Sequence, residues 1–260
     1  MNHSKRPVKS ICSALAATAL LLLTACQPSQ YVVTHTASSY LAVDSTLDGR
    51  TSQAAMAFIA PYQAHVDSVM NKKVGATSVA MDRFRPESPL SNLVADVLRQ
   101  SAGQILGHEA DMGLVNMGGI RSSLPLGDLT IANIFEILPF ENSLCVLTMK
   151  GKYMLQLCHE IAGIKGEGVS GVRLRINEKG ELLEALIGGK PIEEEKTYTL
   201  ATLDYLADGN DRMTACLQAE KRECPAGMTV RKIFMDYTMS QAAAGKKLEA
   251  KIEGRIVIEK

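Results

Sequence analysis

The sequence predicts a single domain of the α+β class. Helical and extended segments follow one another irregularly, without the regular strand–helix–strand repeats that a doubly wound sheet requires. The chain has 260 residues, of which 46% are hydrophobic and 22% charged, enough apolar material for one sizeable core. No internal repeat is evident, so we expect one compact domain over residues 51–260, including a leading helix.

The first 25 residues have the layout of a secretory signal. Three basic residues and no acidic residue precede an apolar run from Ala14 to Leu23. This run is shorter than the roughly 20 apolar residues that a membrane-spanning helix needs, which argues against an uncleaved anchor. The motif Leu23-Thr24-Ala25-Cys26 resembles the lipobox of bacterial lipoproteins. We therefore expect residues 1–25 to be removed, and lipid on Cys26 to hold the protein on the periplasmic or surface face of a bacterial membrane.

The charge balance argues against nucleic acid as a partner. Formal net charge is zero, and removing the three basic residues of the signal from the 28 basic residues leaves 25 against 28 acidic ones. Nucleic-acid binding relies on clustered Lys and Arg side chains that neutralise phosphates. The expected mature chain is mildly acidic instead.

Apolar spacing predicts the elements in chain order. Residues 26–50 are rich in Ser, Thr and Ala and lack periodicity, which predicts a flexible tether. Apolar residues then recur every three or four positions over 54–70, as in an amphipathic helix. We next expect a strand at 74–81, a helix after Pro89, a strand at 111–115, a helix at 130–136 capped by Thr130, a strand at 144–149, a helix at 151–162, strands at 172–176, 182–187 and 197–202, a helix at 230–239 and a strand at 254–258.

Four of the six cysteines lie beyond residue 26. Cys145 and Cys158 fall in apolar stretches, so we expect both to be buried as small hydrophobic side chains. Cys216 and Cys224 flank a polar segment and form either a disulfide, as an exported protein allows, or two free thiols. Neither pair has the CxxC spacing of a zinc site.

A glycine-containing turn follows the predicted strand at 111–115. In Asn116-Met117-Gly118-Gly119-Ile120-Arg121, the glycines allow a sharp turn and a close approach of a ligand. Arg121 carries a planar fork of donors that suits a phosphate. The alternative is an ordinary strand-ending turn with an arginine facing solvent.

Two aromatic residues and a carboxylate follow in predicted loops. Phe140 lies between Pro139 and the polar residues Glu141 and Asn142, a setting typical of a loop tip, although a core position is the alternative. Tyr205 comes directly after a predicted strand, and Asp211 lies in the turn beyond it. Two exposed rings can hold a purine between them. Asp211 can accept the hydroxyls of a ribose, or serve only in forming the turn.

Catalytic signals are missing from the sequence. Arg83 and Arg85 precede Asn92, but such cations are most often surface charges. The histidines have no partner motif, and no cluster of His and Asp suits a metal ion. No GxSxG elbow, phosphate-binding loop or HExxH motif occurs.

Taken in this order, the segments resemble the C-terminal domain of the bacterial and animal 5′-nucleotidases, including the UDP-sugar hydrolases. The similarity covers about residues 74–213 and is carried by residues 87–96, 116–121, 127–130, 138–140 and 198–211. It implies a single layered α/β/β/α domain preceded by a linker-like helix. In that family this domain binds the nucleoside part of the substrate, while a metallophosphatase domain holds two metal ions and performs hydrolysis.

The resemblance also implies roles for individual residues. Phe140 and Tyr205 would stack on the base, and Asp211 would bind the ribose. The phosphate would be contacted by Arg121, by Asn116 and by either Arg83 or Arg85, with assistance from Asn92. Tyr205 stands where the family usually has Phe. The family's Gly-Gly-Asp-Gly with a following aromatic is replaced by Gly209-Asn210-Asp211-Arg212-Met213. Because Arg disfavours left-handed backbone, we expect this loop to bend differently.

The segments that resemble the family contain its recognition part and not its metal ligands. The first hypothesis is therefore the nucleotide-recognition half of a 5′-nucleotidase-type phosphohydrolase, in which a separate metallophosphatase chain supplies two divalent metals and hydrolysis. On this hypothesis the chain has no catalytic or metal-binding residue of its own and is inactive alone. The alternative is a non-catalytic nucleotide-binding, nucleoside-binding or scaffold lipoprotein, which the changes at Asn210 and Arg212 favour.

Overall fold

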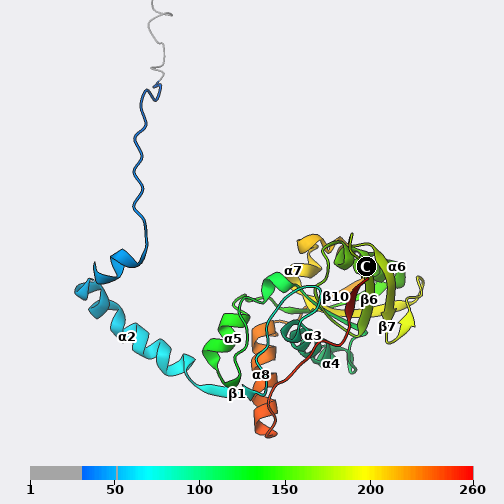
Figure 1. The fold of residues 1–260 in the computed structure, drawn as a ribbon. Helices are drawn as coiled ribbons and strands as arrows, with labels where there is room; N and C mark the ends of the chain where they lie inside the picture. Colours follow the sequence, from blue (N-terminus) through cyan, green and yellow to red (C-terminus); the bar gives the residue numbers. More distant parts are fainter. Residues whose placement is uncertain (1–30, 51, 260) are drawn as a thin grey trace, which may run out of the picture. The chain divides into compact units, whose positions relative to one another are not determined.

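The structure is a computed structural model that describes residues 31–50 and 52–259 (Figure 1). The predicted signal peptide, the predicted lipidation site Cys26 and the start of the predicted tether lie outside these residues. The described part of the tether is exposed and lacks regular secondary structure as far as Val43, and the 3-10 helix η1 (Ser45–Arg50) follows. Contacts divide the chain into two units, Met1–Met56 and Ala57–Lys260.

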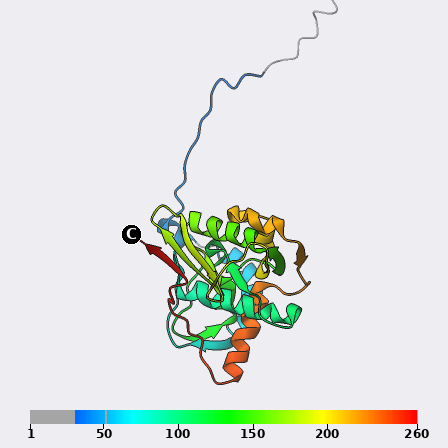
Figure 2. The same ribbon diagram turned by 90° about the vertical axis from the view of Figure 1, so that its right-hand side faces the viewer.

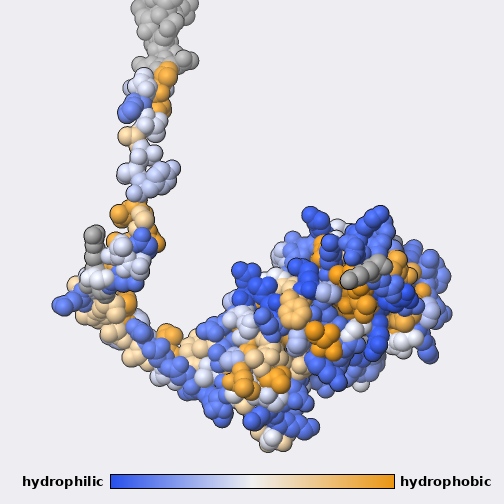
Figure 3. All heavy atoms as spheres, in the orientation of Figure 1, coloured by the Kyte–Doolittle hydropathy of each residue, from blue (hydrophilic) through white to orange (hydrophobic). Residues whose placement is uncertain are grey.

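Helix α2 (Gln53–Met70) confirms the predicted leading helix and runs across the boundary between the two units. None of its residues is buried, and its exposed side chains include five large apolar ones: Met56, Phe58, Ile59, Tyr62 and Val66. Figure 3 colours the described atoms by hydropathy and shows a largely hydrophilic face of the second unit, interrupted by small apolar groups. Within the described ranges, no helix is sufficiently long and apolar to cross a membrane.

A five-stranded sheet forms the centre of the second unit. Its strand order is β10-β4-β9-β2-β5. Strands β2 and β9 are parallel, whereas β4, β5 and β10 run antiparallel to their neighbours. The bounds are β2 (Met112–Val115), β4 (Leu144–Lys150), β5 (Gly168–Ser170), β9 (Thr197–Leu203) and β10 (Lys221–Glu223).

Helix α3 (Pro89–Ser101) packs against β2, β5 and β9. Its start is encoded locally, because Ser88 and Ser91 form a reciprocal capping box and Pro89 occupies the first turn. Gly113 in β2 permits the close approach of the helix, since a Cβ there would lie 2.7 Å from the carbonyl oxygen of Ala95. The helix therefore lies directly over the strand that leads into the candidate site.

Helix α6 (Gly151–Gly163) packs against β4 and β9 and also against a second sheet. Its buried residues Met154, Leu157, Cys158 and Ile161 are spaced by three and four positions, as one helix face requires. The second sheet has the order β11-β6-β7-β8. Its strands are β6 (Val172–Asn177), β7 (Leu182–Ile187), β8 (Lys190–Pro191) and β11 (Ile256–Glu259), and Figure 2 shows strands between the helices.

A two-stranded sheet and two helices complete the unit. Strand β1 (Lys73–Thr77) pairs with β3 (Gly127–Thr130), and α5 (Ile131–Ile137) begins at the predicted cap Thr130. Helix α8 (Val230–Ala243) packs against β1, α3 and α5. The short elements are α4 (Gly103–Leu106), η2 (Met117–Gly119), α7 (Asp204–Ala207), η3 (Asn210–Arg212) and η4 (Thr214–Gln218).

The mixed α and β fold confirms the predicted fold class. The longer elements lie within a few residues of their predicted bounds. The prediction missed β3, β5, β8 and β10, which have two to four residues each. Such strands are too short to show a hydrophobic period in the sequence.

Both alternatives for Cys216 and Cys224, a disulfide between them or two free thiols, are wrong. The disulfide joins Cys145 to Cys224 across 79 positions, and Cys216 is a buried free thiol. The reason is strand pairing: β10 pairs with β4, and the register Glu223 to Val146 brings the next residue, Cys224, beside Cys145. The expectation that Cys145 is buried is confirmed, but not as a free thiol.

Candidate functional site

Three loops meet at one edge of the five-stranded sheet. Because β2 and β9 are parallel, their carboxyl ends lie at the same edge, and the antiparallel strand β4 begins there. The backbone amide of Asp204, just after β9, donates to the carbonyl oxygen of Ser143, just before β4, at 2.9 Å. We call these segments the Asn116 turn (residues 116–121), the Phe140 loop (residues 139–142) and the Tyr205 loop (residues 204–212).

Asn116 connects two of these loops. Its side chain is 6% exposed, and its amide nitrogen Nδ2 donates to Oδ2 of Asp211 at 2.7 Å. Its oxygen Oδ1 is buried and has no hydrogen-bond partner. A Cβ at residue 119 would lie 2.6 Å from this oxygen, so any residue other than Gly119 would displace the Asn116 side chain. The predicted glycine turn is therefore shaped around the side chain of Asn116.

Phe140 is an exposed ring and not a core residue. It is 49% exposed and lines a small pocket together with Asn116. The pocket volume is about 20 Å³, which has room for about one water molecule. Tyr205 is not among the residues that line it. A heterocycle would therefore have to lie on the exposed face of the ring, and not inside the pocket.

Helix α8 holds the Phe140 loop from behind. Arg231 is 7% exposed, and its guanidinium forms an ion pair with Glu141 and donates to the carbonyl oxygen of Pro139 at 3.1 Å. The same group lies 4.1 Å from the centroid of the Phe135 ring. The backbone amide of Val230 also donates to the carbonyl oxygen of Asn142 at 2.9 Å. No local sequence signal pointed to Arg231, because its partners lie about 90 positions away along the chain.

Polar side chains hold the Tyr205 loop. Tyr205 is 39% exposed, and its hydroxyl donates to Oδ1 of Asp211 at 3.0 Å. This hydrogen bond and the charge of Asp211 raise the pKa of the Tyr205 phenol. Asn210 Nδ2 donates to the carbonyl oxygen of Tyr205 at 2.8 Å. The loop bend is unusual for non-glycine residues, because Asp211 has φ 52° and Arg212 has φ 68°.

Two further candidate phosphate ligands differ in their settings: Arg121 ends the Asn116 turn, whereas Asn92 lies in helix α3. Arg121 is exposed, and its Nη1 donates to the carbonyl oxygen of Gly118 at 3.2 Å. Its backbone amide donates to Ile137, which leads into the Phe140 loop. Asn92 is 1% exposed and lies in a different network, in which its amide donates to Glu87 Oε1 at 2.6 Å and to Lys251 O at 2.9 Å. The structure thus does not bring Asn92 to the surface of these loops.

Arg85 is linked to the site through a buried carboxylate. Its guanidinium lies 2.5 Å from Oε1 of Glu167 and donates to the carbonyl oxygen of Gly166 at 2.7 Å. The other oxygen of Glu167 accepts the backbone amide of Met117, in the Asn116 turn. Arg83 is half-buried, and its backbone amide donates to Asp82. These contacts connect Arg85, and not Arg83, to the Asn116 turn.

Glu167 is a second residue that sequence reasoning missed. It is 2% exposed, and burial raises the pKa of its carboxyl group, although the Met117 amide and Arg85 oppose this shift. The negative charge of Asp211 raises this pKa slightly further, because a second carboxylate disfavours ionisation of the first. The one local signal was an acidic residue between Gly166 and Gly168, and such a pattern is more often an exposed turn.

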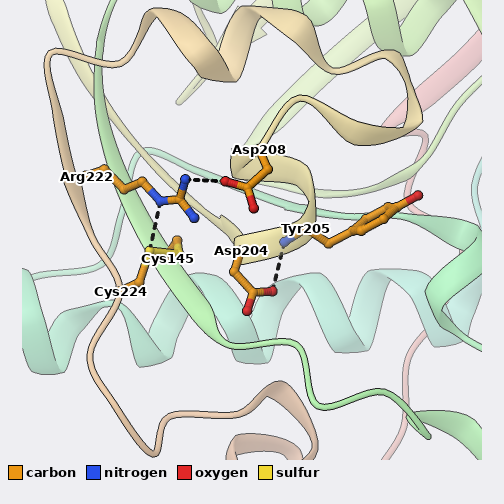
Figure 4. Close-up of a disulfide and its surroundings, with 6 residues drawn as sticks. All are labelled: Cys145, Asp204, Tyr205, Asp208, Arg222 and Cys224. Carbon is orange, nitrogen blue, oxygen red and sulfur yellow. Dashed lines mark hydrogen bonds and ion pairs between the residues drawn. A yellow bond between two sulfur atoms is a disulfide. The ribbon is translucent and has the colours of Figure 1, made fainter.

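The disulfide lies behind the Tyr205 loop (Figure 4). Arg222, two residues before Cys224, contacts its sulfur at 3.1 Å and forms an ion pair with Asp208 at 2.5 Å. Figure 4 shows Arg222 and Asp208 pointing toward each other, while the Tyr205 ring points away from the disulfide. Within residues 31–50 and 52–259, no group of three or more His, Cys, Asp or Glu side chains is placed to hold a metal ion.

The fold and these loops define a mixed α/β domain with aromatic and charged groups at one sheet edge. A family model described as the 5′-nucleotidase C-terminal domain matches residues 73–219, which is more than half of the chain. The chain therefore belongs to the 5′-nucleotidase C-terminal domain family.

Known relatives are longer than this chain. The trifunctional nucleotide phosphoesterase protein YfkN of Bacillus subtilis is 29% identical over 215 residues, which cover 75% of this chain and 14% of that protein. Protein UshA of Escherichia coli is 26% identical over 166 residues, or 62% of this chain and 30% of UshA. The crystal structure of a 5′-nucleotidase precursor from Thermus thermophilus is similar with a TM-score of 0.66 and 28% identity, over 79% of this chain and 42% of that one. The chain thus spans less than half of each.

Proposed function

We propose that this chain is the nucleotide-recognition half of a 5′-nucleotidase-type phosphohydrolase. The observation that carries the proposal is the arrangement at the sheet edge, where two exposed rings, Phe140 and Tyr205, accompany the Asp211 carboxylate and the Asn116 amide. A base would stack on the rings, the ribose hydroxyls would bind Asp211, and the exposed guanidinium of Arg121 would attract the phosphate.

In this proposal the chemistry comes from a separate metallophosphatase chain. Attack of water on phosphorus needs metal ions that lower the pKa of water and neutralise phosphate charge, and two divalent metals held by the partner would supply both. The contribution of this chain is to bind and orient the nucleoside, which lowers the entropic cost of bringing the phosphate to the metals. The relatives named above are more than twice as long as the part that this chain matches, which supports a second unit.

We further propose that the protein is exported and anchored to a membrane of the bacterial envelope by lipid on Cys26. The signal-like sequence at residues 1–25 supports this placement. The disulfide between Cys145 and Cys224 also supports it, because disulfides persist in oxidising compartments. Metabolic labelling with a radioactive fatty acid, compared between the wild type and Cys26→Ser, tests the anchor, and equal labelling of both would exclude it.

Calorimetric titration of the full chain with adenosine and AMP tests the recognition role. We expect both to bind, and Phe140→Ala to weaken adenosine roughly 5- to 150-fold, since stacking of a base on an aromatic ring contributes about 1–3 kcal/mol. Phe58→Ala is the matched control, because Phe58 is an exposed ring on α2, outside the three loops. Absence of heat with either ligand would leave a scaffold lipoprotein as the remaining function.

A phosphate-release assay separates this proposal from an enzyme that is complete in itself. The purified chain should release no phosphate from AMP, with or without added divalent metal ions. Hydrolysis that survives further purification and disappears in Asp211→Asn would overturn the split arrangement while leaving nucleotide recognition in place. Binding without hydrolysis is the expected result.

A further inference from the structure

Both oxygens of the Asp211 carboxylate are already held by other residues. Oδ1 accepts the hydroxyl of Tyr205 at 3.0 Å, and Oδ2 accepts the amide of Asn116 at 2.7 Å. An ionised carboxylate offers about four lone-pair positions, so about one remains free on each oxygen. This leaves the group able to accept two further hydrogen bonds side by side.

The backbone alone does not determine where this carboxylate points. Asp211 has φ 52° and Arg212, which follows it, has φ 68°. Both residues are therefore in the left-handed backbone region, which residues other than glycine adopt at some energetic cost. Asp211 is exposed, so packing restricts its side chain little. Its orientation therefore depends on its two hydrogen bonds.

Tyr205 is itself tied to the same turn. Asn210, the neighbour of Asp211, donates to the carbonyl oxygen of Tyr205 at 2.8 Å. The hydroxyl bond to Asp211 closes a ring of contacts between residues 205, 210 and 211. The aromatic ring and the carboxylate are thus held as one unit.

We propose that the Tyr205 hydroxyl is a positioning group that holds Asp211 ready to accept both hydroxyls of a vicinal diol. Tyr205 then has two separable roles, since its ring stacks on a base and its hydroxyl selects ligands with an intact ribose. The inference rests on the proposed nucleoside binding and names the feature of the ligand that this site distinguishes. A phenylalanine at this position would retain the first role and lose the second.

Tyr205→Phe separates the two roles by calorimetry on the full chain. We expect it to weaken adenosine about 5- to 10-fold, as loss of one hydrogen bond to a carboxylate at an exposed site predicts, and to change 2′,3′-dideoxyadenosine less than about 2-fold. The preference for the ribose form therefore falls. Tyr62→Phe, at an exposed tyrosine of α2, should leave both affinities unchanged. An unchanged preference in Tyr205→Phe would overturn the inference.

A ligand-free measurement distinguishes this failure from failure of the proposed function. Ultraviolet titration of the tyrosines, with Tyr205→Phe subtracted, reports the ionisation of Tyr205 alone. Asp211→Asn should lower the pKa of Tyr205, because the raising hydrogen bond and charge are removed. If the wild type binds neither ligand, the proposed function fails and diol selection with it. If it binds but Asp211→Asn leaves the Tyr205 titration unchanged, the hydroxyl does not position Asp211 and only this inference fails.

Discussion

The Phe140 loop and the Tyr205 loop lie at the same sheet edge but are held there by different interactions. The backbone hydrogen bond from Val230 to Asn142 and the buried guanidinium of Arg231 hold the Phe140 loop. The Tyr205 loop is held mainly by hydrogen bonds among its own exposed side chains, with one bond from the buried Asn116 amide, and two of its residues have positive φ angles. Packing and buried hydrogen bonds resist solvent competition, whereas exposed polar bonds contribute little each. The Tyr205 loop should therefore be the more adjustable wall of the site.

The disulfide lies near the Tyr205 loop, to which Arg222 is joined through Asp208, and breaking it should have the largest effect. Closing 79 residues between Cys145 and Cys224 predicts a stabilisation of about 2–4 kcal/mol. Reduction should therefore lower the free energy of unfolding, measured by urea denaturation with and without a reductant. Cys216→Ala is the control, since its free thiol is buried and its pKa is raised by burial to about 12. If the effect of the reductant disappeared in Cys216→Ala, the bond would have to involve Cys216 after all.

Arg231→Met should have the next largest effect, through the Phe140 loop. It removes the ion pair to Glu141, the bond to Pro139 and the contact with the Phe135 ring, which together predict a loss of about 1–3 kcal/mol in the free energy of unfolding. Adenosine affinity should fall with it, because Phe140 loses its support. Lys232→Met is the matched control on the same helix, where an exposed pair with Asp236 contributes about 0.5 kcal/mol or less. Equal losses in both variants would show that Arg231 does not brace the loop.

The pH dependence of stability should show how the third segment, the Asn116 turn, is held. Burial raises the pKa of Glu167 above its usual value of 4.5, so its contribution to stability is fully present below that value and is lost as the pH rises through the folded pKa. Glu167→Gln should remove this decline. The free energy of unfolding of the variant should therefore increase relative to that of the wild type as the pH increases. Urea denaturation at several pH values measures the difference.

Asp82→Asn provides a control of opposite sign for this experiment. Hydrogen bonds from Ser123 and from the Arg83 amide lower the pKa of Asp82 below 3.8, so its contribution is present at higher pH and is lost on acidification. The free energy of unfolding of the wild type should therefore increase relative to that of Asp82→Asn as the pH rises. The increase should be small, because Asp82 is exposed. Parallel curves for Glu167→Gln and the wild type would contradict the burial of an ionised carboxylate beside the turn.

Asn210→Ala should have the smallest effect. It removes the exposed hydrogen bond to the Tyr205 carbonyl oxygen. The free energy of adenosine binding should weaken by about 0.5–1 kcal/mol, which calorimetry would show as a roughly 2- to 5-fold lower affinity. Thermal unfolding should change little. If Asn210→Ala lowered adenosine affinity more than Arg231→Met does, the Tyr205 loop would be the more rigid of the two loops, which contradicts the comparison made above.

Local sequence predicted most elements because their signals span only a few residues. Thr130 caps α5 through Asn133, and α3 starts at the capped turn around Pro89. The short strand β10 carried no such signal, and its pairing with β4 is what places Cys224 beside Cys145. The error in the disulfide and the missed strand therefore have one cause.

The same division applies to the candidate site. Five site residues could be selected from the sequence, because they lie in loops that follow or precede predicted strands: Asn116, Arg121, Phe140, Tyr205 and Asp211. Glu167 and Arg231 could not, because their roles come from contacts with residues about 50 and about 90 positions away along the chain.

By itself, the sequence determined which segments are helical or extended, that the class is α+β, and which loops carry aromatic and charged groups. Tertiary structure alone decided that β2 and β9 are parallel, so that these loops meet, and which cysteines, carboxylates and guanidinium groups pair. The physical reason is one of range. Capping and hydrophobic periodicity act within a few residues, whereas each pairing depends on where distant strands are placed by the core as a whole.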